Sequence, residues 1–297
     1  MRIGYACLTV GVVDTAIKSC RARNADARRL YEITENNLLS LEHMLYYNIE
    51  NNIRLFRISS ELIPFGSSLV NTIKWWDLFR TQFEKLAEII KKHQLRVSMH
   101  PGQYTVLNSP NEEVVKRTIA DLEYHARVLE ALGTDSRHKI ILHIGGIYKD
   151  KKEAAERFML NYDRLHNRIK QRLVIENDDK SYNIMDVLTI GRSCGIPVVF
   201  DNLHHKVNPP DIIKDEIDWI NECKATWKKE DGRQKIHYSQ QDRDKKAGSH
   251  SQSINPAEFI EFVQRLGRKD IDIMLEVKDK NRSAVECIRM LQELDLI

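Results

Sequence analysis

Several features that would place this chain in a specialised class of protein are missing from its sequence. No apolar run approaches the roughly 18 residues that a membrane-spanning helix needs. Five cysteines are scattered over 297 residues without a CxxC pair. Neither a zinc finger nor a disulfide framework is therefore indicated, and we expect reduced thiols. P-loop and dinucleotide-binding glycine motifs are also missing.

Charge and targeting signals are weak as well. The formal net charge of +3 gives no sign of a nucleic-acid partner. The basic stretches Lys18–Arg29 and Arg243–Lys246 are typical of solvated surface. The first ten residues, MRIGYACLTV, show no charged-then-apolar order of a signal peptide. We therefore expect a soluble, cytoplasmic monomer with no membrane partner.

Eight short β-branched runs alternate with segments of helical periodicity along the whole chain. Strict alternation of this kind produces parallel strands joined by right-handed crossovers, and the runs are apolar on both faces, as buried strands are. No linker divides the sequence, so it predicts an α/β protein with a single (β/α)₈ TIM-barrel domain over residues 1–297. The predicted strands are Ile3–Cys7, Arg54–Ser59, Leu95–Met99, Lys139–Ile144, Leu173–Glu176, Ile196–Asp201, Gln234–Tyr238 and Ile271–Val277.

Metal-capable side chains lie at the ends of six of these strands. In a closed barrel the carboxyl ends of the strands converge on one pocket, where active sites lie. A single such side chain is ordinarily a satisfied polar group, whereas six strands ending this way predict a metal site. The residues are His100, His143, Glu176, Asp201, His237 and Glu276.

Three further residues belong to this prediction. His204 follows Asp201 with D-x-x-H spacing, so that both side chains can point into one site, and His250 lies in a polar loop that could fold over it. Lys235 shares a strand face with His237 and must be deprotonated, paired or chemically modified there. His205 is expected to pack elsewhere. The remaining histidines are expected to be exposed or to cap helices: His43, His93, His125, His138 and His166.

The mixture of imidazoles and carboxylates without thiolates suits Mn²⁺, Zn²⁺ or Fe²⁺. There are too many ligands for one ion, and Glu176 lies between neighbouring strands that contribute His143 and Asp201, so it is placed to bridge two ions. Two ions about 3.5–4 Å apart can polarise a phosphodiester and stabilise its leaving oxygen. Metal-assisted phosphate hydrolysis is therefore the favoured chemistry. Alternatives on the same barrel are a metal-dependent sugar isomerase or epimerase and a non-catalytic sensor of DNA damage.

A series of motifs, in order from the first strand to the eighth, resembles the UV damage endonucleases, which are related to endonuclease IV and to xylose isomerase-like barrels. The most specific is SMHPGQY at Ser98–Tyr104. The others are GYAC, RISSELIPFGS, LHIGG, IEND, FDNLHH, KIHYS and LEVKDK. The resemblance implies a metal-dependent DNA-repair endonuclease acting on double-stranded DNA. Such enzymes nick immediately 5′ of cyclobutane pyrimidine dimers and 6-4 photoproducts, and many also cut at abasic sites, leaving 3′-hydroxyl and 5′-phosphate ends.

The resemblance also assigns roles to residues. It implies two to three divalent ions, Mn²⁺ foremost with Zn²⁺, Co²⁺ or Fe²⁺ as alternatives. Gln103 and Tyr104 resemble a pair that wedges into the duplex opposite the lesion, and Tyr5 resembles an aromatic contact to the extruded pyrimidines. Catalytic roles fall to Glu176, Glu276, His143 and Lys235. The implied ligands are His100, His143, Glu176, Asp201, His204, His237, His250, Glu276 and Lys235, the last as a carboxylated lysine.

The chain departs from the family pattern in two places. Ser68 stands where a further histidine is expected after the second strand, and Thr9 stands where an asparagine is expected after the first. One ion would then be held more weakly, and one lesion contact is in doubt. Arg57, Lys278 and the backbone of Gly145–Gly146 are additional candidates for phosphate contacts.

Overall fold

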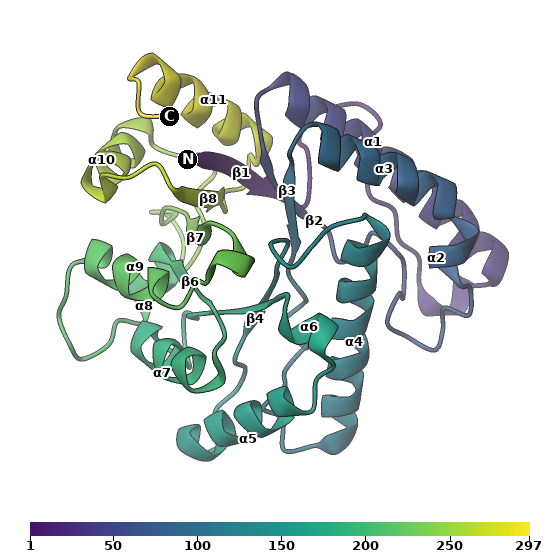
Figure 1. Cartoon of the computed structure of the whole chain (residues 1–297), viewed down its shortest axis with the longest axis horizontal. Coiled ribbons are helices and arrows are strands. Elements are labelled where there is room, and N and C mark those ends of the chain that lie inside the picture. Colours follow the sequence, from purple (N-terminus) through teal and green to yellow (C-terminus); the bar gives the residue numbers. More distant parts are fainter.

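A computed structural model describes residues 1–297 as a closed barrel of eight parallel strands surrounded by helices (Figure 1). Strand order follows the sequence, and β1 closes the barrel against β8, with Arg2–Tyr5 in register with Asp272–Leu275. The predicted fold class is confirmed. The strands are β1 (Arg2–Ala6), β2 (Leu55–Ile58), β3 (Arg96–Met99), β4 (Ile140–His143), β5 (Leu173–Glu176), β6 (Val198–Asp201), β7 (Gln234–Tyr238) and β8 (Ile271–Leu275).

Amphipathic helices cover the outside of the barrel, and none has the combination of length and apolar character that a membrane-crossing helix requires. Local signals define several ends: Asn255 caps α10 ahead of Pro256, and Gly195 ends α7 with a φ of 68°. The helices are α1 (Ala27–Glu50), α2 (Trp75–Leu78), α3 (Arg80–Lys92), α4 (Glu112–Ala131), α5 (Lys151–Asp163), α6 (Asn167–Lys170), α7 (Ile184–Cys194), α8 (Asn202–Val207), α9 (Glu216–Lys224), α10 (Pro256–Leu266) and α11 (Asn281–Glu293), with short 3₁₀ turns η1 (Ala22–Asn24) and η2 (Lys229–Asp231).

The apolar core has an outer and an inner part. The outer part is a cluster of 62 buried residues that includes the contacts between strands and helices. Inside the barrel there are only small apolar clusters. Because side chains alternate along a strand, the residue two positions after an inward apolar side chain also points inward. This alternation brings three candidate ligands to the carboxyl end of the barrel, in the pairs Ile141 and His143, Val174 and Glu176, and Val199 and Asp201.

The expectation that the strands are apolar on both faces is wrong for the half of the barrel where the strands begin. Arg96 of β3, Lys235 of β7 and Asp272 of β8 are all buried. Arg96 donates to Asp272 Oδ2 at 2.8 Å and also to three backbone carbonyls. The amino ends of the strands therefore meet in a network of buried charges beneath the metal-capable residues.

Candidate metal centre

Glu176, at the end of β5, lies at the middle of the candidate metal centre and is 1% exposed. Its Oε2 atom lies 3.1 Å from His100 Nε2 and 3.7 Å from His143 Nε2, while its Oε1 atom accepts a hydrogen bond from His237 Nδ1. Three groups of side chains have ligand atoms within 4.8 Å of one another, and every group contains Glu176. They are His100, His143 and Glu176; Glu176, Asp201 and His204; and Glu176, His237 and Glu276.

Because these groups are buried close together, their pKa values depart from the usual ones. Burial, with Glu176 and Glu276 nearby, raises the pKa of Asp201 to about 7. Burial opposes the charge on His204, but Asp201 and the other carboxylates outweigh it and raise the pKa of His204 to about 9. Burial lowers the pKa of His143 to about 4, so this imidazole is neutral at neutral pH. Negative charge at this density requires compensation by protons or by a cation.

Two buried atoms in the site have no hydrogen-bond partner. They are Asp201 Oδ2 and His143 Nδ1. Buried polar atoms are almost always satisfied, and a bound ion is one reason for an exception. The donor set of imidazole nitrogens and carboxylate oxygens suits first-row divalent ions. The residues present therefore fit divalent metal ions.

Hydrogen bonds on the far sides of the rings orient the histidines. His100 Nδ1 donates to the Pro101 carbonyl at 3.0 Å, and His204 Nδ1 donates to the Asn177 carbonyl at 2.9 Å. His100 consequently presents Nε2 to Glu176. Outer partners of this kind fix the tautomer and raise the basicity of a metal ligand.

Sequence reasoning missed Asn177 and Asn202, each of which directly follows a candidate ligand. The Asn177 side chain pairs with the backbone N–H and carbonyl of Asp201, at 2.9 and 3.0 Å. The Asn202 side chain pairs in the same way with the backbone N–H and carbonyl of Ser239, at 2.8 and 3.0 Å. These amides tie β5 to β6 and β6 to β7 just beyond the regular pairing. Repetition of Glu-Asn and Asp-Asn at successive strand ends was the signal available in the sequence.

Arg57 is not available for DNA, so the expectation of a phosphate contact there is wrong. It is 6% exposed, and its Nη2 atom donates to Glu276 Oε1 at 2.5 Å and to His237 Nε2 at 2.8 Å. This arrangement leaves His237 Nδ1 facing Glu176 and Glu276. Lys278 pairs with Asp242 at 2.7 Å. Arg57 is therefore an internal support for two candidate ligands.

Lys235 and His250 lie outside the three groups. Lys235 is fully buried one inward position below His237, and its Nζ atom has no hydrogen-bond partner, which favours deprotonation or chemical modification over pairing. Burial, with Arg96 and Arg57 nearby, holds the pKa of Lys235 well below its usual range. His250 forms an isolated bridge with Gln241, and Glu276, His204 and Lys280 are the charged groups close to its ring.

Of the two predicted wedge residues, Gln103 lies on a cavity shared with candidate ligands. Gln103 and His143 line the same cavity, which has a volume of about 400 Å³ and also includes His204 and Gly145–Gly146. Tyr104 is 73% exposed on the loop between β3 and α4. The Gln103 amide thus faces the cavity of the candidate metal centre, and the Tyr104 ring is exposed on the same loop.

Tyr5 is placed differently. Its ring is fully buried, and its hydroxyl contacts Thr9 Oγ1 at 2.7 Å and donates to Asn48 Oδ1 at 2.8 Å. Contact with a base would require displacement of the residues that cover it. Ser68 is exposed on the loop after β2. His205 packs against Phe200 and Trp219, as expected.

The closed parallel barrel with metal-capable side chains at its carboxyl end defines a class that includes both endonucleases and sugar epimerases. Endonuclease IV from Thermus thermophilus has a TM-score of 0.61 at 12% identity, with 100% of each chain covered. A 3-keto-D-glucoside 4-epimerase from E. coli has a TM-score of 0.60 at 10% identity, with 99% of each chain covered. Such distant likeness shows the fold alone.

Within that class the chain belongs to the UvdE family, described as UV-endonuclease UvdE, which matches residues 1–297. It is 44% identical over 296 residues to the UV DNA damage endonuclease of Clostridium perfringens, covering 99% of this chain and 72% of that protein. The crystal structure of SacUVDE has a TM-score of 0.95 at 38% identity, with 100% of both chains covered. The family resemblance seen in the motifs is confirmed.

Proposed function

We propose that the protein is a metal-dependent DNA-repair endonuclease that cuts the phosphodiester immediately 5′ of UV photoproducts in double-stranded DNA. The proposed lesions are cyclobutane pyrimidine dimers and 6-4 photoproducts, with abasic sites as further substrates. The products are 3′-hydroxyl and 5′-phosphate ends. We also propose that the enzyme acts as a monomer in the cytoplasm.

The observation that carries this proposal is the position of Glu176 in all three ligand groups. A carboxylate with two oxygens can bridge ions, and three overlapping groups provide more donors than one ion can use. Divalent ions held here, Mn²⁺ foremost, would polarise the phosphodiester, lower the pKa of water and stabilise the leaving oxygen. A sugar epimerase requires a simpler ligand set, so the crowded site favours hydrolysis.

The chain's own residues orient these groups. Glu276 is held by Arg57, and His237 lies between Glu176 and Glu276. Together with Glu176 and His143 these side chains surround the proposed position of the scissile phosphate. His250 is proposed as a further ligand because its ring lies in a loop facing Glu276 and His204.

Gln103 and Tyr104 are proposed to enter the duplex where the damaged bases leave it. Extruding a base costs a few kcal/mol, and less where damage has weakened pairing and stacking. Side chains inserted between base steps offset part of that cost. The exposure of Tyr104 and the position of Gln103 on the cavity support this role. Tyr5 would contact the extruded bases only after the residues that bury its ring move away.

Lys235 is proposed to be carboxylated. Carbon dioxide would add to the neutral amine, forming an N–C bond with loss of one proton, and the carbamate oxygens would act as an anionic ligand. A buried Nζ atom without a partner beside two arginines supports this proposal. Intact mass measured at neutral pH should exceed the sequence mass by one carbon dioxide and should return to it after acid treatment. An unmodified lysine under non-acidic conditions would contradict it.

The decisive experiment compares UV-irradiated with untreated supercoiled plasmid in the presence of Mn²⁺, with a chelator as control. The proposal expects nicking of irradiated plasmid only, abolished by the chelator. Sequencing gel analysis of a duplex with one defined lesion then locates the cut. Equal nicking of both plasmids, or of neither, would reject the proposed specificity.

A further inference from the structure

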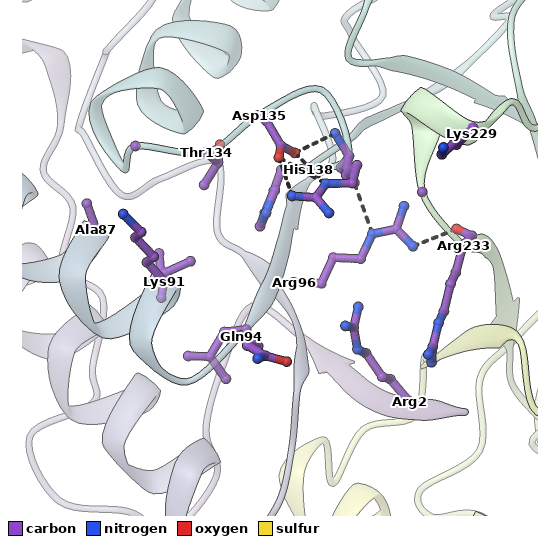
Figure 2. Close-up of a pocket in the computed structure, with 15 residues that line it drawn as sticks. Arg2, Ala87, Lys91, Gln94, Arg96, Thr134, Asp135, His138, Lys229 and Arg233 are labelled. Atoms are coloured by element: carbon purple, nitrogen blue, oxygen red, sulfur yellow. Dashed lines mark hydrogen bonds and ion pairs between the residues drawn. The ribbon is translucent and has the colours of Figure 1, made fainter.

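A second cavity lies at the opposite end of the barrel, where the strands begin. Its volume is about 670 Å³, and it is lined by the start of β1 and β3, the end of α3, the α4–β4 loop and η2 with the residues after it (Figure 2). Figure 2 shows Lys91 on one side of this cavity and Arg2, Arg96 and Arg233 on the other. None of these residues belongs to the candidate metal centre. We call this cavity the basal pocket.

Positive charge dominates the lining of the basal pocket. Asp135 is the only carboxylate that lines it, and it is already paired with Arg137. Lys91, Lys229 and Arg233 form no ion pair with any carboxylate and donate no side-chain hydrogen bond. The six cationic lining residues are Arg2, Lys91, Arg96, Arg137, Lys229 and Arg233.

The fold uses only some of these cations. Arg96 is 4% exposed and donates hydrogen bonds to Asp272 and three backbone carbonyls, so its side chain is held in place at the bottom of the pocket. Lys91 lies in the last turn of α3, where a cation interacts favourably with the helix dipole, whereas Arg233 lies outside any helix. Arg2 Nη1 lies 3.7 Å from Asp272 Oδ2. Burial lowers the pKa of Arg2, Asp272 opposes this shift, and Arg233, Arg96 and Arg137 add to it.

We propose that the basal pocket binds a compact anion carrying two or more phosphate groups. A volume of several hundred Å³ is that of a small-molecule site, and arginine is the residue best suited to phosphate oxygens. The unpaired cations stand on different elements around one opening, so several phosphates are needed to reach them together. A DNA duplex is too wide to enter such a recess and would bridge it.

The test is calorimetric titration of the metal-loaded protein with inorganic tripolyphosphate. Lys91→Glu and Arg233→Glu change exposed side chains of the pocket, whereas Lys92→Glu makes the same charge change on the neighbouring exposed residue that does not line it. We expect saturable binding that each pocket variant weakens about tenfold or more, since a reversed charge lies close to the phosphates. Lys92→Glu should stay within about threefold of the parent. Bound ligand should also raise the melting temperature of the parent protein.

Four results would overturn the proposal. No saturable binding would reject the site. Equal weakening by Lys92→Glu would mean a general charge effect, and binding that survives both pocket variants but disappears on metal removal would belong to the metal centre. A short duplex that binds through Lys91 and Arg233 while tripolyphosphate does not would assign this face to DNA instead. Nicking of irradiated plasmid is measured separately, so either proposal can fail without the other.

Discussion

We expect the effect on metal affinity of removing one side chain from the candidate metal centre to depend on how many of the three ligand groups contain it. His100 belongs to one group, whereas Glu176 belongs to all three and is buried at the centre of the site. Its negative charge also stabilises the protonated form of the nearby histidines. Burial disfavours that charge, but His237, His100 and His143 outweigh it and hold the pKa of Glu176 well below its usual range.

Glu176→Gln keeps the size of the side chain and removes its charge. We expect Mn²⁺ affinity to fall by at least about a hundredfold, because loss even of an outer hydrogen-bond partner costs roughly 10–100-fold. Nicking of irradiated plasmid should fall below detection. Metal content by atomic absorption and the plasmid assay measure the two effects. The matched control is His205→Gln, since His205 adjoins His204 but packs against Phe200 and Trp219. Full activity of Glu176→Gln would show that the centre is misplaced.

The double variant Gln103→Ala with Tyr104→Ala should separate lesion binding from metal binding. Stacking on an aromatic side chain is worth about 1–3 kcal/mol, so affinity for a lesion-containing duplex should fall about tenfold or more. Metal content and melting temperature should stay unchanged because Tyr104 is largely exposed. Fluorescence anisotropy with damaged and undamaged duplexes gives the comparison. Loss of metal in this variant would contradict the wedge assignment.

At the scale of elements, one face of α4 holds the loop that carries His100 and the proposed wedge residues Gln103 and Tyr104. Thr105 Oγ1 donates to Asp121 Oδ2 at 2.7 Å, and Val106 N–H donates to Thr118 Oγ1 at 3.0 Å. His125 was expected to be exposed or capping, and that expectation is wrong, because it is 1% exposed. Its Nε2 atom lies 2.9 Å from Ser60 Oγ, which donates to the His100 carbonyl at 2.7 Å.

Thr105→Val should loosen this loop without removing any candidate ligand. The substitution leaves the buried Asp121 carboxylate without its donor, which costs about 1–3 kcal/mol. We expect faster hydrogen exchange of the amides of residues 102–106 and weaker binding of lesion-containing DNA at unchanged metal content. Thr189→Val is the control, since the Thr189 hydroxyl donates to the Met185 carbonyl on the exposed face of α7. Unchanged exchange in the loop would show that Asp121 does not restrain it.

At the scale of the whole barrel, the seam between β3 and β4 is the least regular. Only Met99 and Ile140 are in register there, whereas five pairs join β7 to β8. His138 extends the seam, because its Nδ1 atom accepts from the Val97 N–H at 3.1 Å. An imidazole that accepts a hydrogen bond must be neutral. Burial lowers the pKa of His138 to about 3, in agreement with this role.

The stability of the barrel should therefore depend on the protonation of His138. The unfolded chain binds this proton near pH 6.5 and the folded chain only near pH 3, so this contribution is complete above pH 6.5 and is lost as the pH falls. In His138→Gln the loss of unfolding free energy between pH 6 and pH 4 should be smaller by up to about 1.4 kcal/mol per pH unit. Urea unfolding at several pH values across this range measures the free energy of unfolding and its pH dependence. His93→Gln, at the end of α3, should keep the slope of the parent protein; an unchanged slope in His138→Gln would reject the role of His138.

Much of this architecture was predictable because the relevant signals are local. The period of a strand places the residue two positions after Val174 or Val199 inside the barrel, and this period is visible in the chain itself. Asn255 before Pro256 and Gly195 define helix ends through their own backbone preferences. The strand ends, the barrel and the candidate ligands at its carboxyl end follow from such signals, and the HPGQY motif indicates the family.

Other features depend on side chains that are distant in sequence, so no local pattern contains them. The sequence placed Glu176 between His143 and Asp201, but its membership of the third group, with His237 and Glu276, depends on β7 and β8 closing the barrel around it. Arg57 supports Glu276, 219 positions away, instead of facing DNA, and the basal pocket gathers Arg2, Lys91 and Arg233 from three separate elements. Alternation along a strand is a property of neighbouring residues, whereas these contacts exist only after barrel closure brings the strands together.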